Sequence, residues 1–187
     1  MNPVTHGLVS WIVANAPGTD RRERQAITIA GIAPDIDGFG YPVEVLTATS
    51  AQPLEWFHRF HHHLTHNALA CVVFAGLAFA WTRGSWRAAG LALATASLHL
   101  LCDLVGSRGP DGNQWPLPLF QPFADGECTW SGQWPLVSWQ NTVITLGAFI
   151  ATIALAVRRG FSPVEIVSLS GDRRFIEILR ARLGLRR

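Results

Sequence analysis

The chain has 187 residues, of which 49% are hydrophobic and 15% are charged. Soluble domains typically carry about 25% charged residues, so this composition excludes a disordered chain and argues against an ordinary soluble enzyme. The formal net charge of +2 is too small to indicate nucleic-acid binding through bulk electrostatics.

Two short apolar runs open the chain, residues 5–16 and residues 24–36, separated by the turn-like segment PGTDRR. As helices, each would rise only about 18–20 Å. They are predicted to form a helical hairpin that either packs against the other helices and dips partly into a bilayer, or spans it. No signal peptide is expected, because charged residues follow the first run directly and no small-residue cleavage site is present.

Three longer runs follow. Residues 136–157 carry no charge and exceed the roughly 20 residues that a spanning helix needs. Residues 67–82 are also uncharged but slightly short, and residues 86–105 are long enough, with polar residues near both ends. The short connection RGSWR between these two runs favours an antiparallel helical hairpin.

The remaining segments are polar or irregular. Residues 38–60 and 106–135 are rich in Gly and Pro and are expected to be irregular, while residues 172–182 (DRRFIEILRAR) are typical of a basic amphipathic helix lying at a surface. The sequence therefore predicts an all-α, polytopic membrane helical bundle of about five helices, the first two short, with an irregular Trp/Pro/Gly-rich loop and a C-terminal amphipathic helix. Residues 1–160 would form the membrane domain, and residues 161–187 a basic cytoplasmic tail.

The arginines predict an orientation. If the five runs cross alternately, thirteen of the fifteen basic residues lie on one side of the membrane, and the other side holds only Arg59 and Arg108. Basic residues near membrane spans are retained in the cytoplasm, so the Arg-poor side should face the periplasm of a bacterium. Membrane lipids are the expected surroundings.

The same alternation places all seven histidines at the Arg-poor end. His99 and Asp103 are four residues apart and share one face of a helix. Polar groups in an apolar segment are costly unless they line a cavity or meet a partner. A mutual hydrogen bond or a cap at the helix end is the alternative interpretation of this pair.

Two further motifs lie at this end. Asp35 and Asp37 stand between a Pro and a Gly, where two carboxylates can face one divalent cation or simply end a helix in solvent. The segment HRFHHHLTH, His58–His66, favours metal binding by imidazoles over a pH-sensitive surface loop. Thr65 is predicted to cap the following helix.

Together these groups exceed what one closed structural zinc site requires, as expected of a hydrolytic metal site with an open position. The predicted metal ligands are His6, Asp35, Asp37, His61, His66, His99 and Asp103. The predicted general acid, general base or extra ligand comes from His58, His62 and His63. Arg59 is predicted either to hold a phosphate with its guanidinium or to anchor the chain at the membrane interface.

The chain resembles a family of membrane-bound, metal-dependent, inner-membrane-associated hydrolases (YdjM-like proteins), some members of which are labelled LexA-binding. The segments that carry the resemblance are MNPVTHGLVSW, GIAPDID, HHHLTHN, SLHLLCD, WPLPLF and SPVEIVSLSGDRRF. In that family, Arg and Gly usually stand where this chain has His62 and His63, and Ser where it has Asn67. The resemblance implies a hydrolase. Its distant similarity to zinc-dependent phospholipase C implies one or two divalent ions, expected to be zinc, and phosphoester substrates.

The function expected from the sequence is thus an integral inner-membrane hydrolase. Its His/Asp-bound metal would activate water at the periplasmic surface, on a phosphoester or lipid-linked substrate. The alternative is a non-catalytic membrane protein with a structural or transport-related metal site. Transport would require polar groups deeper in the spans, and residues 67–82 and 142–157 have almost none.

Overall fold

The computed structural model describes residues 1–109 and 112–185, apart from the side chain of His58. Within this part the chain is helical and forms no strand, which confirms the predicted all-α class. The elements are α1 (Pro3–Ala14), α2 (Arg21–Ile32), η1 (Ala33–Phe39), α3 (Gly40–Thr47), α4 (Trp56–Phe60), α5 (Ala68–Trp81), α6 (Trp86–Gly106), α7 (Trp139–Arg159), η2 (Pro163–Ile166) and α8 (Leu169–Arg182).

The five apolar runs correspond to α1, α2, α5, α6 and α7. Each of these helices begins at a polar residue whose side chain accepts a hydrogen bond from the first turn: Asn2, Asp20, Asn67, Ser85 and Ser138. These caps satisfy backbone N–H groups that a helix start leaves without partners. The boundaries of the helices are therefore set by local sequence.

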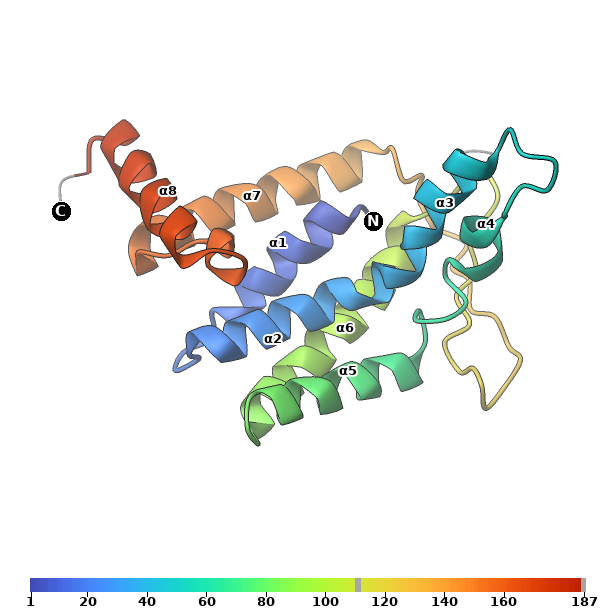
Figure 1. Cartoon of the computed structure of the whole chain (residues 1–187), viewed down its shortest axis with the longest axis horizontal. Helices are drawn as coiled ribbons and strands as arrows, with labels where there is room; N and C mark the ends of the chain where they lie inside the picture. Colours follow the sequence, from blue (N-terminus) through green and yellow to red (C-terminus); the bar gives the residue numbers. More distant parts are fainter. Residues whose placement is uncertain (110–111, 186–187) are drawn as a thin grey trace.

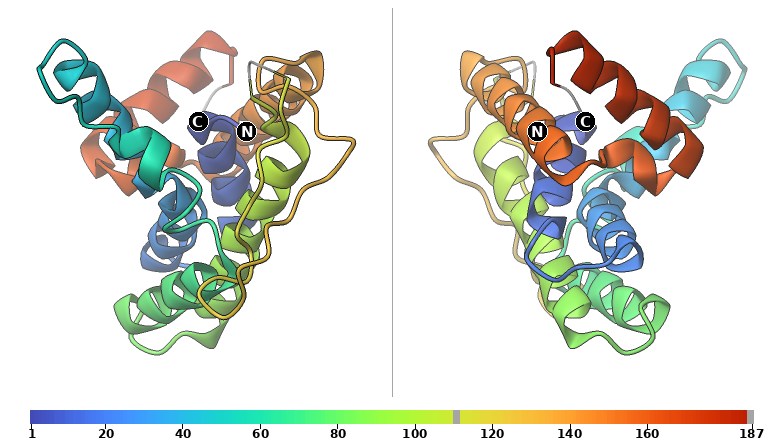
Figure 2. Two further views of the ribbon diagram at one scale, coloured as in Figure 1. Left: turned by 90° about the vertical axis from the view of Figure 1, so that its right-hand side faces the viewer. Right: turned by 90° about the vertical axis from the view of Figure 1, so that its left-hand side faces the viewer.

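Helix α2 lies at the centre, in contact with α1, α5 and α6. Figures 1 and 2 show α1 and α2 between α5 on one side and α7 and α8 on the other. Small residues allow this packing: Ala26 and Ala30 of α2 are buried against Ala78 and Ala92. A side chain at Gly31 would collide with Ser10 of α1, so that position must remain glycine for the three helices to approach this closely.

Two helices, α6 and α7, are long and apolar enough to cross a membrane, and α1 and α5 are shorter apolar helices. The outer face of α7 exposes a row of large apolar side chains: Val143, Leu146, Phe149 and Ile150. Contiguous exposed apolar surface of this kind suits contact with lipid. The exposed face of α7 is therefore the face expected to meet the bilayer.

The prediction that residues 38–60 are irregular is wrong over two stretches, which form α3 and α4. Pro42 lies in the first turn of α3, where a missing N–H costs nothing. Gly40 lets α3 begin against the backbone of Trp56 and Phe57, since a Cβ at this glycine would lie 2.7 Å from the Phe57 nitrogen. The glycine and the proline that predicted an irregular segment are therefore compatible with a helix here, because one allows close packing and the other lies in the first turn.

The long loop between α6 and α7 is irregular over its described residues, as predicted, and contains only isolated bridges: Arg108 with Pro135 and Leu117 with Cys128. Gln133, almost fully buried, ties this loop to the end of α6 because its amide donates to the carbonyl of Asp103 at 3.1 Å. The loop therefore closes over one end of the helices.

The C-terminal segment packs against the other helices. The sequence predicted only a helix lying at a surface, without this contact. Ile176 of α8 is buried with Trp11 and Ala156. Arg24 of α2 makes two short hydrogen bonds to the carboxylate of Glu165, at 2.6 and 2.7 Å, and both side chains are buried. An ion pair this well shielded from water depends on both partners being present.

We therefore expect Glu165→Ala to lower the free energy of unfolding by about 3–5 kcal/mol, because it leaves the Arg24 guanidinium buried without its counter-charge. Unfolding of the purified protein by titration with a denaturing detergent measures the change. Glu127→Ala, which removes an exposed loop carboxylate, is the matched control and should change stability by less than about 0.5 kcal/mol. Equal effects of the two variants would contradict the role given to the ion pair.

Candidate metal centre

The His and Asp residues singled out in the sequence come from four elements that meet at one end of the molecule. This end lies opposite the Arg-rich start of α2, opposite the α5–α6 connection with Arg83, and opposite α8 (Figure 1). Helix α6 contributes His99 and Asp103, and η1 contributes Asp35 and Asp37. The segment before α5 contributes His66, and α1 contributes a further histidine.

Four of these side chains converge. One ligand atom from each of Asp35, His66, His99 and Asp103 lies within 4.8 Å of the others. Oδ2 of Asp103 lies 3.1 Å from Nε2 of His99 and 3.5 Å from Nε2 of His66. We call these four residues the metal cluster.

The metal cluster contains buried polar atoms without partners. Among the described residues, neither Nε2 of His66, nor Nε2 of His99, nor Oδ2 of Asp35 makes a hydrogen bond. Buried polar atoms are normally satisfied, and two imidazole nitrogens facing two carboxylates fit a divalent cation. The cluster could therefore hold a metal ion, and its mixed nitrogen and oxygen donors suit several divalent metals.

The imidazoles of His66 and His99 are each oriented by a hydrogen bond at Nδ1, on the side of the ring away from the cluster centre. Nδ1 of His99 donates to the carbonyl of Gly31 at 2.8 Å, and Nδ1 of His66 lies 3.2 Å from Oδ2 of Asp37. A hydrogen bond at Nδ1 places the unprotonated Nε2 toward the centre and fixes the ring. The close packing at Gly31 thus directly positions one ligand of the cluster.

Asp37 lies behind the cluster, although it was predicted as a ligand. Its Oδ1 is 2.8 Å from Nδ1 of His61, and its Oδ2 accepts from the Thr65 hydroxyl at 2.9 Å as well as facing His66. Burial alone would raise the pKa of this carboxyl, but the hydrogen bonds from His61 and His66 hold the pKa well below its usual range. Asp37 is therefore an anion that supports His66. It also pairs with Nδ1 of His61, the other residue predicted as a ligand.

The cap predicted at Thr65 is wrong. Its hydroxyl donates to the carbonyl of Pro34 and to Asp37, and Asn67 caps α5 instead, accepting from the nitrogen of Ala70 at 2.9 Å. Thr65 thus links the segment before α5 to η1. Its role depends on a contact across 31 residues of sequence, which local patterns do not reveal.

His6 covers the cluster from α1. Its ring stacks on His99 with a centroid separation of 3.6 Å, and its Nε2 lies 3.2 Å from Oδ1 of Asp103. The same Oδ1 accepts from Ser107 at 2.9 Å and contacts the amino nitrogen of Met1. Because Oδ1 is occupied, Asp103 turns Oδ2 toward the cluster. Ser107 was not among the predicted site residues, although its spacing of four from Asp103 places both on one helical face.

The predicted catalytic residues differ in burial: His62 is buried beside the metal cluster, whereas the others described are exposed. His62 is buried, with a φ of 68°, and its ring lies between His66 and Trp115 at centroid distances of 4.3 and 4.7 Å. Burial lowers the pKa of His62 to about 2, and His66 and His61 act in the same direction, so the ring is neutral. His63 and Arg59 are exposed.

One further predicted catalytic residue, His58, has its side chain outside the described part of the structure.

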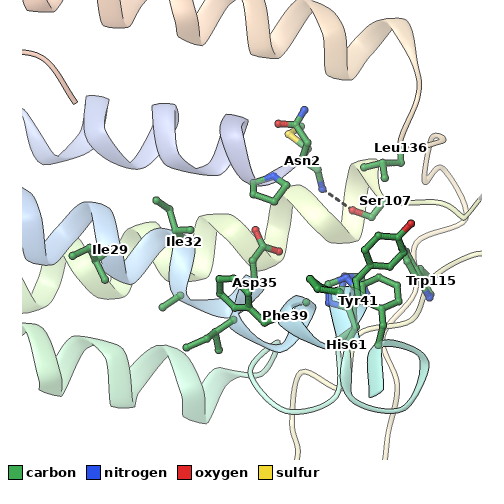
Figure 3. Close-up of a pocket in the computed structure, with 18 residues that line it drawn as sticks. Asn2, Ile29, Ile32, Asp35, Phe39, Tyr41, His61, Ser107, Trp115 and Leu136 are labelled. Carbon is green, nitrogen blue, oxygen red and sulfur yellow. Dashed lines mark hydrogen bonds between the residues drawn. The ribbon is translucent and has the colours of Figure 1, made fainter. Parts of the chain in front are cut away.

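A cavity of about 770 Å³ adjoins the metal cluster (Figure 3). Asp35, His61 and His62 form part of its wall, and most of the remaining lining side chains are apolar. Polar groups that converge in a largely apolar cavity are the usual composition of a ligand-binding site. Asp35 is thus the member of the metal cluster that borders the cavity.

The sequence of this helical chain matches the family model described as "YdjM inner membrane protein" over residues 1–173. The chain belongs to the YdjM inner membrane protein family. Membership and the two membrane-capable helices together point to an inner-membrane location. No curated protein and no solved structure matches the chain.

For this YdjM-family chain we expect a graded loss of metal in three variants. His66→Ala removes a ligand and should abolish stoichiometric binding, whereas Asp37→Ala removes only the support of that ligand and should weaken affinity about 10–100-fold. His63→Ala, an exposed neighbour, is the control and should bind as the wild type does. Titration of the detergent-purified proteins with zinc and a competing chelator gives the three affinities.

If wild type retains no metal, or if His66→Ala binds as tightly as His63→Ala, the assignment of the cluster is wrong. Thermal unfolding of each variant shows whether it is folded.

Proposed function

We propose that this chain is an integral-membrane, metal-dependent hydrolase that cleaves a phosphoester at the membrane surface. The observation that carries the proposal is the position of Asp35, which belongs both to the metal cluster and to the wall of the cavity. A structural metal is normally enclosed by its ligands, whereas a hydrolytic one keeps a position open to substrate. Contact between cluster and cavity supports the second arrangement.

Asp35, His66, His99 and Asp103 would hold the ion. When bound, a divalent ion of this kind lowers the pKa of water and polarises the scissile group. Zinc is the ion we propose, because the donor set includes two imidazole nitrogens and the resemblance noted in the sequence implies it. The cluster atoms all lie within 4.8 Å of one another, a size that supports one ion.

His62 is the residue that we propose to accept or return a proton during hydrolysis. It lines the cavity, its ring is neutral, and its Nδ1 has no hydrogen-bond partner among the described residues. A general base must be deprotonated and able to reach the substrate, and the neutral ring and cavity-wall position of His62 support this role. His63 is exposed and is absent from the cavity wall, so it has no comparable support.

Arg59 lies with its guanidinium carbon 5.9 Å from the ring centre of Phe60. Of the two roles predicted for this exposed residue, the contact supports interfacial anchoring more than phosphate binding. Stacking on an aromatic ring is a favourable arrangement for Arg near a membrane surface.

The proposed orientation places the metal cluster toward the periplasm and the C-terminus in the cytoplasm. The support is the charge distribution: most arginines lie at the start of α2, around the α5–α6 connection, at the end of α7 and in α8, and the cluster lies at the other end (Figure 1). Basic segments beside membrane helices are retained in the cytoplasm.

We expect the purified, metal-loaded protein to hydrolyse a phosphoester in a screen of soluble and lipid substrates. Removal of the metal by a chelator should abolish turnover, and added metal should restore it. His62→Ala should lower kcat by about 10²–10⁴-fold with unchanged metal content, since general acid–base catalysis contributes on that scale. His63→Ala is the matched control. Full metal occupancy without turnover on any substrate would favour a non-catalytic metal site.

For the orientation, we expect alkaline phosphatase fused after Arg187 to be inactive and green fluorescent protein at the same position to fluoresce. Alkaline phosphatase folds only in the periplasm, so a fusion inserted after Gly126, in the loop between α6 and α7, should be active. Phosphatase activity from the fusion after Arg187 would show that the orientation is reversed.

A further inference from the structure

The C-terminal end of α2 and the start of η1 together line the cavity as far as Asp35. Ile29 and Ile32 of α2 and Ala33 and Ile36 of η1 all contribute to the wall. Ile29 precedes Asp35 by six residues, three steps along α2 and three along η1, which is about 10 Å along the axis. Figure 3 shows Ile29 and Ile32 on α2 leading away from Asp35. We call this part of the cavity the α2 limb.

Aromatic side chains line the cavity on the other side of Asp35. Phe39, Tyr41, Phe57 and Trp115 belong to its wall, and in Figure 3 the labelled members of this group lie beyond Asp35 from Ile29. Phe39 and Tyr41 are 73% and 57% exposed. Tyr and Trp are enriched where a membrane meets water. The cavity therefore changes from aliphatic to aromatic across the metal cluster.

The two sides of the cavity also differ in their depth within the molecule. Helix α2 begins at the Arg-rich end and reaches the metal cluster at its C-terminal end. A path from Asp35 to Ile29 therefore leads from the cluster end toward the middle of the helices. In a membrane this direction runs from the surface into the hydrocarbon.

We propose that the α2 limb binds one hydrocarbon chain of a membrane lipid whose phosphoester lies at the metal cluster. This inference rests on the proposed hydrolase function and adds the substrate class. A small soluble phosphoester would need the carboxylates and imidazoles, but it would make no use of an isoleucine-lined limb. The whole cavity, of which the α2 limb is one part, has a volume of about 770 Å³, in the range of ligand-binding clefts.

The first experiment measures binding of n-alkylphosphonates, which imitate a phosphoester headgroup but resist hydrolysis. Radiolabelled members of increasing chain length are equilibrated with the full chain in lipid nanodiscs, and partition into empty nanodiscs is subtracted. Referred to the free ligand concentration in water, the affinity should rise by about fourfold for each methylene that enters the limb. The affinity should then stop rising at the chain length that fills the limb.

The second experiment shortens the limb. Ile29→Trp fills its far end while leaving the residues of the metal cluster unchanged. This variant should reach its affinity limit at a shorter chain than wild type, with equal affinity for the shortest phosphonates. Ile150→Trp, which makes the same substitution at an exposed position of α7, is the matched control and should behave as wild type does. Equal metal content in all three proteins shows that they are folded.

An affinity that does not depend on chain length would overturn the proposal, as would an unchanged limit in Ile29→Trp. These outcomes are separable from failure of the hydrolase proposal, because binding is measured without turnover and can be repeated after the metal is removed. Hydrolysis of short soluble phosphoesters without any dependence on chain length would support the enzyme and reject the lipid. Binding that depends on chain length, without hydrolysis of any substrate, would support the lipid site and reject the hydrolase.

Discussion

The hydrogen bond from Nδ1 of His99 to the carbonyl of Gly31 connects the helix packing to the site. Gly31 has no side chain, so α2 can approach Ser10 of α1 and Thr95 of α6, whose hydroxyl bonds to the carbonyl of Ile27. This approach brings the Gly31 carbonyl to His99 and orients its Nε2 inward. It also places η1, which directly follows α2, beside α6. Asp35 therefore reaches the cluster because of packing that occurs one turn earlier.

The molecule separates its polar interactions between two ends. At the Arg-rich end, the buried pair of Arg24 with Glu165 joins α2 to the C-terminal segment, and Arg87 bonds to Glu23 at 2.6 Å. At the other end, imidazoles and carboxylates meet, with Asp37 held as an anion. The apolar middle of the helices is left for lipid. The proposed function places the phosphoester at this polar end, where Asp35 borders the cavity.

Part of this arrangement was predictable. The five apolar runs became helices because apolar length and side-chain caps act locally. The gathering of the histidines at one end followed from the alternation of those runs. Helices α3 and α4 were missed because Gly40 and Pro42 are used there for close packing and for a helix start. For Asp37 and His61, the sequence indicated that both lie near the site. That they pair with each other and that Asp37 also faces His66 follows only from the tertiary structure.

The sequence by itself determined the helical class, the family and the set of side chains from which the candidate metal centre is built. These follow from periodicity, composition and local motifs. Only the tertiary structure decided that Asp35, His66, His99 and Asp103 converge, that Asp37 supports His66 from behind, and that an apolar limb along α2 opens beside Asp35. The physical reason is that ligand geometry depends on distances between α1, η1, the segment before α5, and α6. Side-chain packing sets those distances across long separations in the chain.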